Sequence, residues 1–192
     1  MKVFIGGSLG VKNLDDVVMD EFQKLINENA EILVGDALGA DTIVQAYFSV
    51  CNYENVTVYV SGDNVRENMG DNEIKHIEVP SEIHGKEFYM QKDIAMANDC
   101  DCGFMLWNGR SKATFENIRR LNSMGKSTRV YLTNEKRLLT VKGKKDYINL
   151  LGVKGVAKLL SPDTTIKEAI DYCNEISDFE AVFAEYIHLE GL

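Results

Sequence analysis

Short apolar runs alternate, over the first two thirds of the chain, with longer segments whose apolar residues recur at helical spacing. The short runs end in glycine or polar residues, which is typical of buried strands followed by turns. They cover residues 3–5, 32–34, 56–60, 103–107 and 129–132, with a further short strand expected at 76–79. The segments between them predict helices at about 14–27, around 43–47, at 86–98 and at about 115–124. Strands that alternate with helices form βαβ units, so we expect an α/β fold, a Rossmann-like parallel sheet with helices on both faces.

The pattern changes after residue 132. Residues 136–145 indicate a basic hairpin or loop, residues 161–164 a helix start, and residues 179–187 a last apolar face. We therefore divide the chain into a core, residues 1–132, and a C-terminal extension, residues 133–192, which packs on the core or on a partner. Because the apolar face needs cover, we expect a homodimer.

Composition narrows the classes of partner. The 192 residues carry 30 acidic and 21 basic side chains, a net charge of −9. A duplex nucleic acid needs clustered Lys and Arg, so we expect no such partner, although a small anion can bind the N–H groups of a helix N-terminus. No stretch approaches the roughly 18 apolar residues that span a bilayer, and the N-terminus lacks a signal-peptide pattern, so we expect a cytoplasmic protein without membrane contact. The four cysteines and three histidines show no zinc spacing, and we expect neither metal nor cofactor.

Three segments follow the carboxyl ends of predicted strands, where open parallel sheets bind ligands. They are residues 6–8, 35–41 and 107–116. In the first, Gly6 and Gly7 permit a ligand to approach the backbone closely, and Ser8 can donate to a phosphate or a hydroxyl. An ordinary turn from strand to helix explains this segment equally well.

The second segment is a glycine-rich turn that begins with Gly35. Gly39 lacks a side chain where a helix begins, so the following amides can point at an anion. Asp36 and Asp41 can accept from ribose hydroxyls, or Asp41 merely complements the helix dipole. The spacing is not G-x-G-x-x-G, and residues 125–127 (Gly-Lys-Ser) are no P-loop, because they join a helix to a strand.

The third segment carries the most chemistry. Asn108, Gly109 and Ser111 precede a helix whose first turn we expect to hold Thr114, Glu116 and Asn117. A carboxylate at Glu116 can stabilise or attack the cation-like sugar of a breaking N-glycosidic bond, or it only complements the helix dipole. Trp107, the single tryptophan, either stacks on a base or packs under the loop.

These residues resemble the SLOG superfamily, which includes LOG-type nucleotide phosphoribohydrolases, DNA-processing proteins and ligand sensors. Residues 3–10 resemble its opening strand and turn, and residues 32–41 its second strand and glycine turn. Residues 91–96 and 99–109 are similar to its fourth unit, and residues 114–117 (Thr-Phe-Glu-Asn) to the Gly-Thr-x-Glu-Glu stretch of the phosphoribohydrolases. That helix start also resembles nucleoside 2-deoxyribosyltransferases. The resemblance covers about residues 1–132 and implies a Rossmann-like sheet, commonly dimeric, that binds a nucleotide or a nucleotide-derived ligand.

The chain departs from the phosphoribohydrolases at several positions. They carry Pro-Gly-Gly where this chain has residues 107–109 (Trp-Asn-Gly), and their second Glu is Asn117 here. Their Arg before the Lys is Gln91, although Lys92 can supply part of its charge. The lost arginine fork weakens bidentate phosphate recognition.

Three functions remain open at this stage. The first is a SLOG-like sensor or binding protein for a nucleotide-derived small molecule. The second is an N-glycosidic bond hydrolase or transferase, with Glu116 as nucleophile or cation stabiliser and Asp93 or Asp99 assisting. The third is a structural subunit that docks through residues 179–187. Fold alone does not decide between them.

Overall fold

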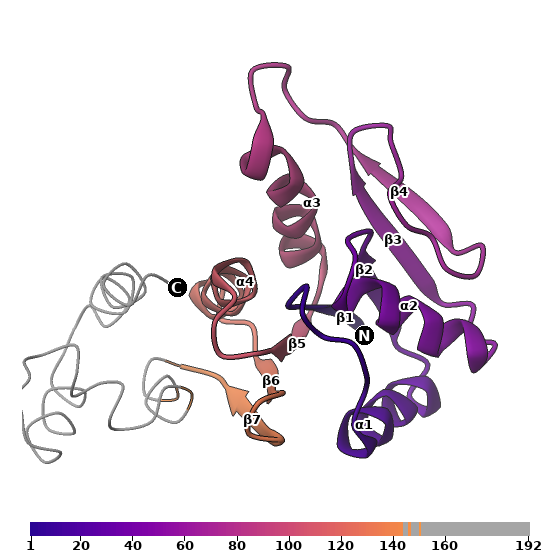
Figure 1. Cartoon of the computed structure of the whole chain (residues 1–192), viewed down its shortest axis with the longest axis vertical. Coiled ribbons are helices and arrows are strands. Elements are labelled where there is room, and N and C mark those ends of the chain that lie inside the picture. Colours follow the sequence, from indigo (N-terminus) through magenta and orange to yellow (C-terminus); the bar gives the residue numbers. More distant parts are fainter. Residues whose placement is uncertain (144–145, 147–149, 151–192) are drawn as a thin grey trace, which may run out of the picture.

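The computed structural model describes residues 1–143, 146 and 150. Eleven elements follow one another along the chain, and seven of them are strands of one sheet (Figure 1). In chain order they are β1 Lys2–Gly7, α1 Asp16–Asn27, β2 Glu31–Gly35, α2 Ala40–Val50, β3 Val56–Ser61, β4 Glu73–Ile77, α3 Gly85–Asp99, β5 Cys102–Trp107, α4 Lys112–Ser123, β6 Thr128–Leu132 and β7 Arg137–Val141.

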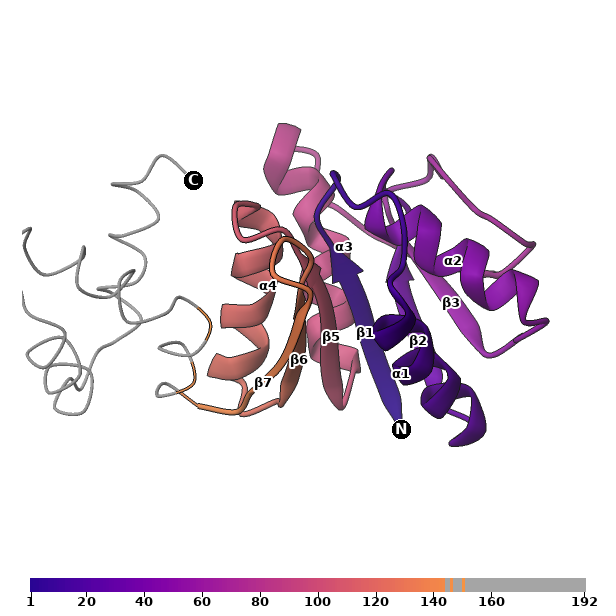
Figure 2. The same cartoon turned by 60° about the horizontal axis from the view of Figure 1, so that its bottom comes forward.

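The sheet has the order β4-β3-β2-β1-β5-β6-β7, and every neighbouring pair is parallel except β6 and β7. Figure 2 shows β1 in the middle of the sheet, with β2 and β3 on one side of it and β5, β6 and β7 on the other. The expected α/β, Rossmann-like arrangement is confirmed. Each parallel connection contains the helix that the apolar periodicity predicts, apart from the direct link between β3 and β4.

Helices cover both faces of the sheet because successive strand residues point to opposite sides. From β1, Phe4 joins a core with α3 and α4, whereas Val3 and Ile5 join a second core with α1 and α2. Both cores consist mainly of branched aliphatic and aromatic side chains with almost no exposed surface. The two cores leave the polar residues for the strand ends, where the loops of interest begin.

The sheet continues past residue 132. The basic segment at 136–145, expected as a hairpin or loop, contributes β7, which pairs antiparallel with β6 from Leu132–Arg137 to Thr128–Val141. A boundary at 132 therefore falls inside a hairpin of the sheet. The expected helix start at 161–164 and the apolar face at 179–187 lie outside the described residues, so the homodimer that rests on that face stays a prediction.

The start of α4 corrects one expectation from the sequence, and the ends of α3 and α4 explain the Gly-Lys-Ser stretch at residues 125–127. Ser111 caps α4 by accepting the backbone N–H of Thr114 at 3.3 Å, so the helix starts at Lys112 and Glu116 lies in its second turn, not in the first as expected. Gly125, with φ +70°, follows the end of α4, and Lys126 Nζ donates to the carbonyls of Ala97 and Asn98 at the end of α3. Gly125 thus follows the end of α4, and Lys126 binds the last carbonyls of α3, so the Gly-Lys-Ser sequence is not a phosphate-binding loop.

In the described part of the chain no helix combines the length and the apolar character that crossing a membrane requires.

Candidate functional site

The direction in which successive strands are added to the sheet reverses between β1 and β5, which are parallel neighbours. The chain leaves β1 toward β2 and leaves β5 toward β6, so the two loops diverge at the carboxyl ends of these strands, the position at which open α/β sheets hold ligands. Ser8 lies at this point and is only 1% exposed. Its Oγ accepts the backbone N–H of Asn108 at 3.2 Å and lies 3.3 Å from Thr114 Oγ1. Residues from the first and third predicted segments therefore meet at the switch point.

The loop from β5 to α4 has its own hydrogen-bonded frame. Asn108 Oδ1 accepts the backbone N–H groups of Arg110 (3.0 Å) and Ser111 (2.9 Å). Gly109, between Asn108 and Arg110, adopts φ +73°. The indole N–H of Trp107 donates to the Ser111 carbonyl at 3.0 Å, and its buried ring lies against Phe115. Trp107 is therefore a packing residue beneath the loop in this structure, the second of the two roles expected for it.

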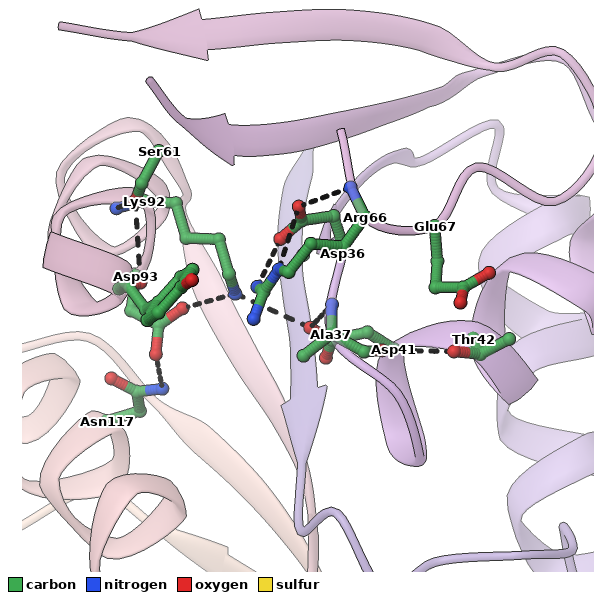
Figure 3. Close-up of polar contacts among 12 residues, drawn as sticks. Asp36, Ala37, Asp41, Thr42, Ser61, Arg66, Glu67, Lys92, Asp93 and Asn117 are labelled. Carbon is green, nitrogen blue, oxygen red and sulfur yellow. Dashed lines mark hydrogen bonds and ion pairs between the residues drawn. The ribbon is translucent and has the colours of Figure 1, made fainter. Parts of the chain in front are cut away.

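A buried ion cluster lies on the other side of β1. Lys92 of α3, 5% exposed, places its ammonium 2.7 Å from Asp93 Oδ1 and 3.4 Å from Asp41 Oδ2 (Figure 3). The backbone N–H of Lys92 donates to Ser61 Oγ, at the end of β3. A Cβ on Gly35 would collide with both Lys92 Nζ and Asp41 Oδ2, so the glycine at the end of β2 makes room for the cluster.

The cluster shifts the ionisation of its members. Burial alone would lower the pKa of Lys92, but attraction to Asp41 and Asp93 outweighs it and raises that pKa, so the amine stays protonated. Burial raises the pKa of Asp41, and the charge of Asp93 adds to the rise, while Lys92 and the N–H of Ala37 oppose it. The ammonium therefore holds two carboxylates in a space with little water.

Asp36 is occupied by an arginine from a distant segment. The guanidinium of Arg66 donates from Nε to Asp36 Oδ2 at 3.1 Å and from Nη2 to Oδ1, and the Arg66 backbone N–H donates to Oδ2 at 3.2 Å (Figure 3). Asp36 is 1% exposed. Its two oxygens are thus engaged by the protein, and the expected contact of Asp36 with a ribose has no vacant oxygen here.

Arg66 belongs to residues 62–72, which connect β3 to β4. The sequence indicates a mobile loop or lid at residues 61–75, but the structure places Ser61 in β3 and residues 73–75 in β4. Gln45 of α2 holds this segment by accepting the N–H of Met69 at 2.7 Å, while its amide donates to the Gly35 carbonyl at 2.7 Å. The segment is therefore fastened to the carboxyl end of β2 and to α2.

A further chain of polar contacts joins α3 to α4. Asn117 Nδ2 donates to Asp93 Oδ2 at 3.0 Å, and Arg120 Nη1 donates to Asn117 Oδ1. Burial lowers the pKa of Arg120. Lys92, Asp93, Asn117 and Arg120 thus form one polar path between the two helices, in which the amide of Asn117 bridges Asp93 to Arg120.

The two remaining candidate carboxylates lie apart from this path. Glu116 is partly exposed and accepts two hydrogen bonds from Arg119 on its own helix. Asp99 ends α3, next to the start of β1, and accepts from Tyr59 and Lys75 at 2.7 Å each. These hydrogen bonds outweigh burial and lower the pKa of Asp99. In the described residues neither carboxylate forms a hydrogen bond with Ser8, Asn108 or Thr114.

The glycines have packing roles that the sequence could not distinguish from ligand contact. A Cβ on Gly39, which has φ +89°, would collide with the backbone of Leu9, and one on Gly7 would collide with Leu106 and Ala40. A Cβ on Gly6 would be tight against Phe4. The chain itself fills the space beside these residues, whether or not a ligand approaches them.

Sequence reasoning missed three residues of the site, Ser61, Arg66 and Arg120. Arg66 lies in a polar segment that resembles any surface loop, and Arg120 lies in α4 beyond the Thr-Phe-Glu-Asn stretch, where it belongs to no motif. The only available signal was for Ser61, the polar residue that ends the apolar run of β3.

No group of three or more His, Cys, Asp or Glu side chains in the described residues is arranged to hold a metal ion. Comparisons with protein-family models, with curated proteins and with solved structures give no match to this chain.

Proposed function

We propose that the carboxyl edge of the sheet binds a nucleotide or a nucleotide-derived small molecule, and that the protein is a SLOG-like sensor or binding protein. The observation that carries this proposal is the buried ion cluster of Lys92, Asp41 and Asp93 beside the carboxyl ends of β2 and β3, since open α/β sheets hold ligands at this edge. Burying Lys92 with two carboxylates costs desolvation energy that an apolar core would avoid, so a role in binding accounts for the cluster better than stability does.

The cluster offers groups that suit a sugar. Asp41 engages Lys92 and the Ala37 N–H through Oδ2, and no described residue contacts its Oδ1. Lys92 has a third N–H beyond the two directed at Asp41 and Asp93. A hydroxyl can donate to such a carboxylate oxygen and accept from such an ammonium, which is the pairing that a ribose presents.

The loops that follow β1 and β2 offer apolar surface. Leu9 and Leu38 are 71% and 66% exposed, and their loops touch because Gly39 packs against the Leu9 backbone. Two exposed leucines on loops at the same edge of the sheet as the ion cluster suit a ligand with a flat apolar part and a hydroxylated part, as in a nucleoside.

The enzymatic alternative needs a carboxylate that can reach the sugar. Arg119 engages Glu116, and Lys92 and Asn117 together engage Asp93. This arrangement favours binding over cleavage of the N-glycosidic bond.

The test is a titration of the full chain with ribo- and deoxyribonucleosides, their monophosphates, NAD and ADP-ribose, followed by calorimetry. A true ligand at about 100 times its Kd should raise the free energy of unfolding by about 2.7 kcal/mol. Asp41→Asn should weaken this binding, whereas the matched control Asp99→Asn, at the opposite end of the parallel strands, should leave it unchanged.

Chromatography of the same mixtures distinguishes binding from catalysis. Free base from the wild type but not from Glu116→Gln would replace the binding proposal with a glycosidic-bond enzyme. If no compound binds, both the binding proposal and the enzymatic alternative are ruled out.

A further inference from the structure

The side chain of Arg66 is held in a defined orientation by Asp36 and Tyr89. Asp36 engages its Nε and Nη2 groups and also its backbone N–H. The guanidinium carbon lies 4.5 Å from the centre of the Tyr89 ring on α3, within the range of a cation–π contact. Few rotamers remain open to a guanidinium that is fixed at one edge and on one face, so little entropy is lost if a ligand contacts it.

The opposite edge of the same guanidinium is open. A guanidinium has five N–H donors, of which Asp36 uses one at Nε and one at Nη2. No described residue accepts from Nη1, and the side chain is 36% exposed although its partner Asp36 is buried. Two N–H groups at Nη1 and one at Nη2 therefore remain for a group from solution.

The guanidinium of Arg66 lies close to the ion cluster of Lys92, Asp41 and Asp93. Figure 3 shows the guanidinium on the side of Asp36 that faces Lys92 and Asp41. The charge of Asp41 contributes to raising the pKa of Arg66, and that of Asp36 to raising the pKa of Lys92, so the two cations share the same carboxylates. The segment that carries Arg66 is fastened to α2 through Gln45, which keeps the arginine beside the proposed site.

We propose that Arg66 binds an anionic group of the ligand through its open edge and makes the site select phosphorylated nucleotides over nucleosides. This inference rests on the proposed function. A planar pair of N–H donors matches two oxygens of a phosphate, and hydrogen bonds between charged groups are the strong ones. Because Asp36 already neutralises Arg66, the preference comes from directed hydrogen bonds more than from a large positive potential.

The experiment compares adenosine, guanosine, cytidine and uridine with their 5′-monophosphates by calorimetry on the full chain. The wild type should bind at least one monophosphate about 10- to 100-fold more tightly than its nucleoside. Arg66→Gln should remove that ratio while it changes nucleoside affinity little, and Arg66→Lys should retain a part of it. Arg137→Gln, which removes an arginine paired with Glu135 on the β6–β7 hairpin, is the control for loss of charge.

Each other outcome separates the possible failures. Equal losses of nucleoside and nucleotide affinity in Arg66→Gln would mean that Arg66 only fastens the segment 62–72, and the inference would fall while the proposed function stands. Loss of the ratio in Arg110→Gln instead would place the phosphate at the β5–α4 loop and would overturn the role of Arg66. A wild type that binds nucleosides and nucleotides equally also overturns it, and a wild type that binds neither removes the proposed function itself.

Discussion

Replacing Lys92 with methionine keeps an unbranched apolar stem of similar length but removes the ammonium between Asp41 and Asp93. The two ion pairs, at 3.4 Å and 2.7 Å, are lost, and two carboxylates remain in a buried space. Removing one partner of a buried ion pair typically costs about 3–5 kcal/mol. This is a large part of the roughly 5–15 kcal/mol that stabilises an ordinary domain. We therefore expect Lys92→Met to fold with strongly reduced stability at neutral pH.

The sign of the pH dependence follows from the shifted pKa values. Burial raises the pKa of Asp41 in the folded wild type, and without the opposing charge of Lys92 the pKa of Asp41 should rise further. A carboxyl whose folded pKa lies above its unfolded value stabilises the fold at low pH and loses this contribution as the pH rises through the folded value. The pKa of Lys92 is raised in the folded state, so its contribution persists until the pH exceeds the unfolded value of about 10.4. The deficit of the variant should thus be largest at neutral pH and smaller near pH 4.5.

Urea unfolding at several pH values, followed by circular dichroism, measures this deficit. Lys75→Met is the matched control, because Lys75 pairs with Asp99 at 2.7 Å but is half-exposed, and such surface pairs are worth about 0–1 kcal/mol. Adding Asp41→Asn to Lys92→Met should recover stability at neutral pH and flatten the pH dependence. A Lys92→Met deficit below about 1 kcal/mol that does not vary with pH would refute the reasoning.

Three further substitutions test the packing around the site by urea unfolding. Gly35→Ala places a methyl group against Lys92 and Asp41, and we expect a loss of about 1–3 kcal/mol together with weaker nucleotide binding; unchanged stability would mean that the cluster can move aside. Gly39→Ala, at φ +89° beside the backbone of Leu9, should lose about 1–3 kcal/mol even without ligand, and a stable variant would contradict that close packing. Ser111→Ala removes the cap of α4 and should cost about 1 kcal/mol and alter the fluorescence of Trp107, which donates to the Ser111 carbonyl; identical spectra and stability would argue against the cap.

The sheet and its helices could be predicted because their signals are local. A buried strand such as β5 is a continuous apolar run, and a helix such as α1 shows its apolar face at helical spacing, so neither depends on distant residues. β7 was less distinct. It lies at the edge of the sheet, where Arg137 and Thr140 are exposed, and a half-exposed polar strand resembles a loop in its composition. For that reason the predicted boundary falls at 132, inside the hairpin.

The candidate site could be predicted only in part. The loops after β1, β2 and β5 were visible as glycine and polar residues that follow apolar runs, and Ser8, Asn108 and Thr114 do meet at the switch point. The partners of the charged residues were not visible. Arg66 lies 30 residues from Asp36, and Lys92 lies 51 residues from Asp41, so no local spacing indicates either pair. Polar composition marked residues 61–75 as a loop, but it cannot tell which element a loop folds against.

These long-range pairs also decide the charge of the site. The carboxyl-end loops and α3 contribute Asp36, Asp41 and Asp93, which taken by themselves would repel a phosphate. Arg66 and Lys92 neutralise two of these charges, and Arg120 reaches the third through Asn117. The net charge of −9 and the acidic side chains therefore say little about the sign of the ligand, since Arg66 pairs with Asp36, and Lys92 pairs with both Asp41 and Asp93. What an anionic ligand would meet is set by the N–H groups that these pairs leave open, and in this fold they belong to Arg66 and Lys92.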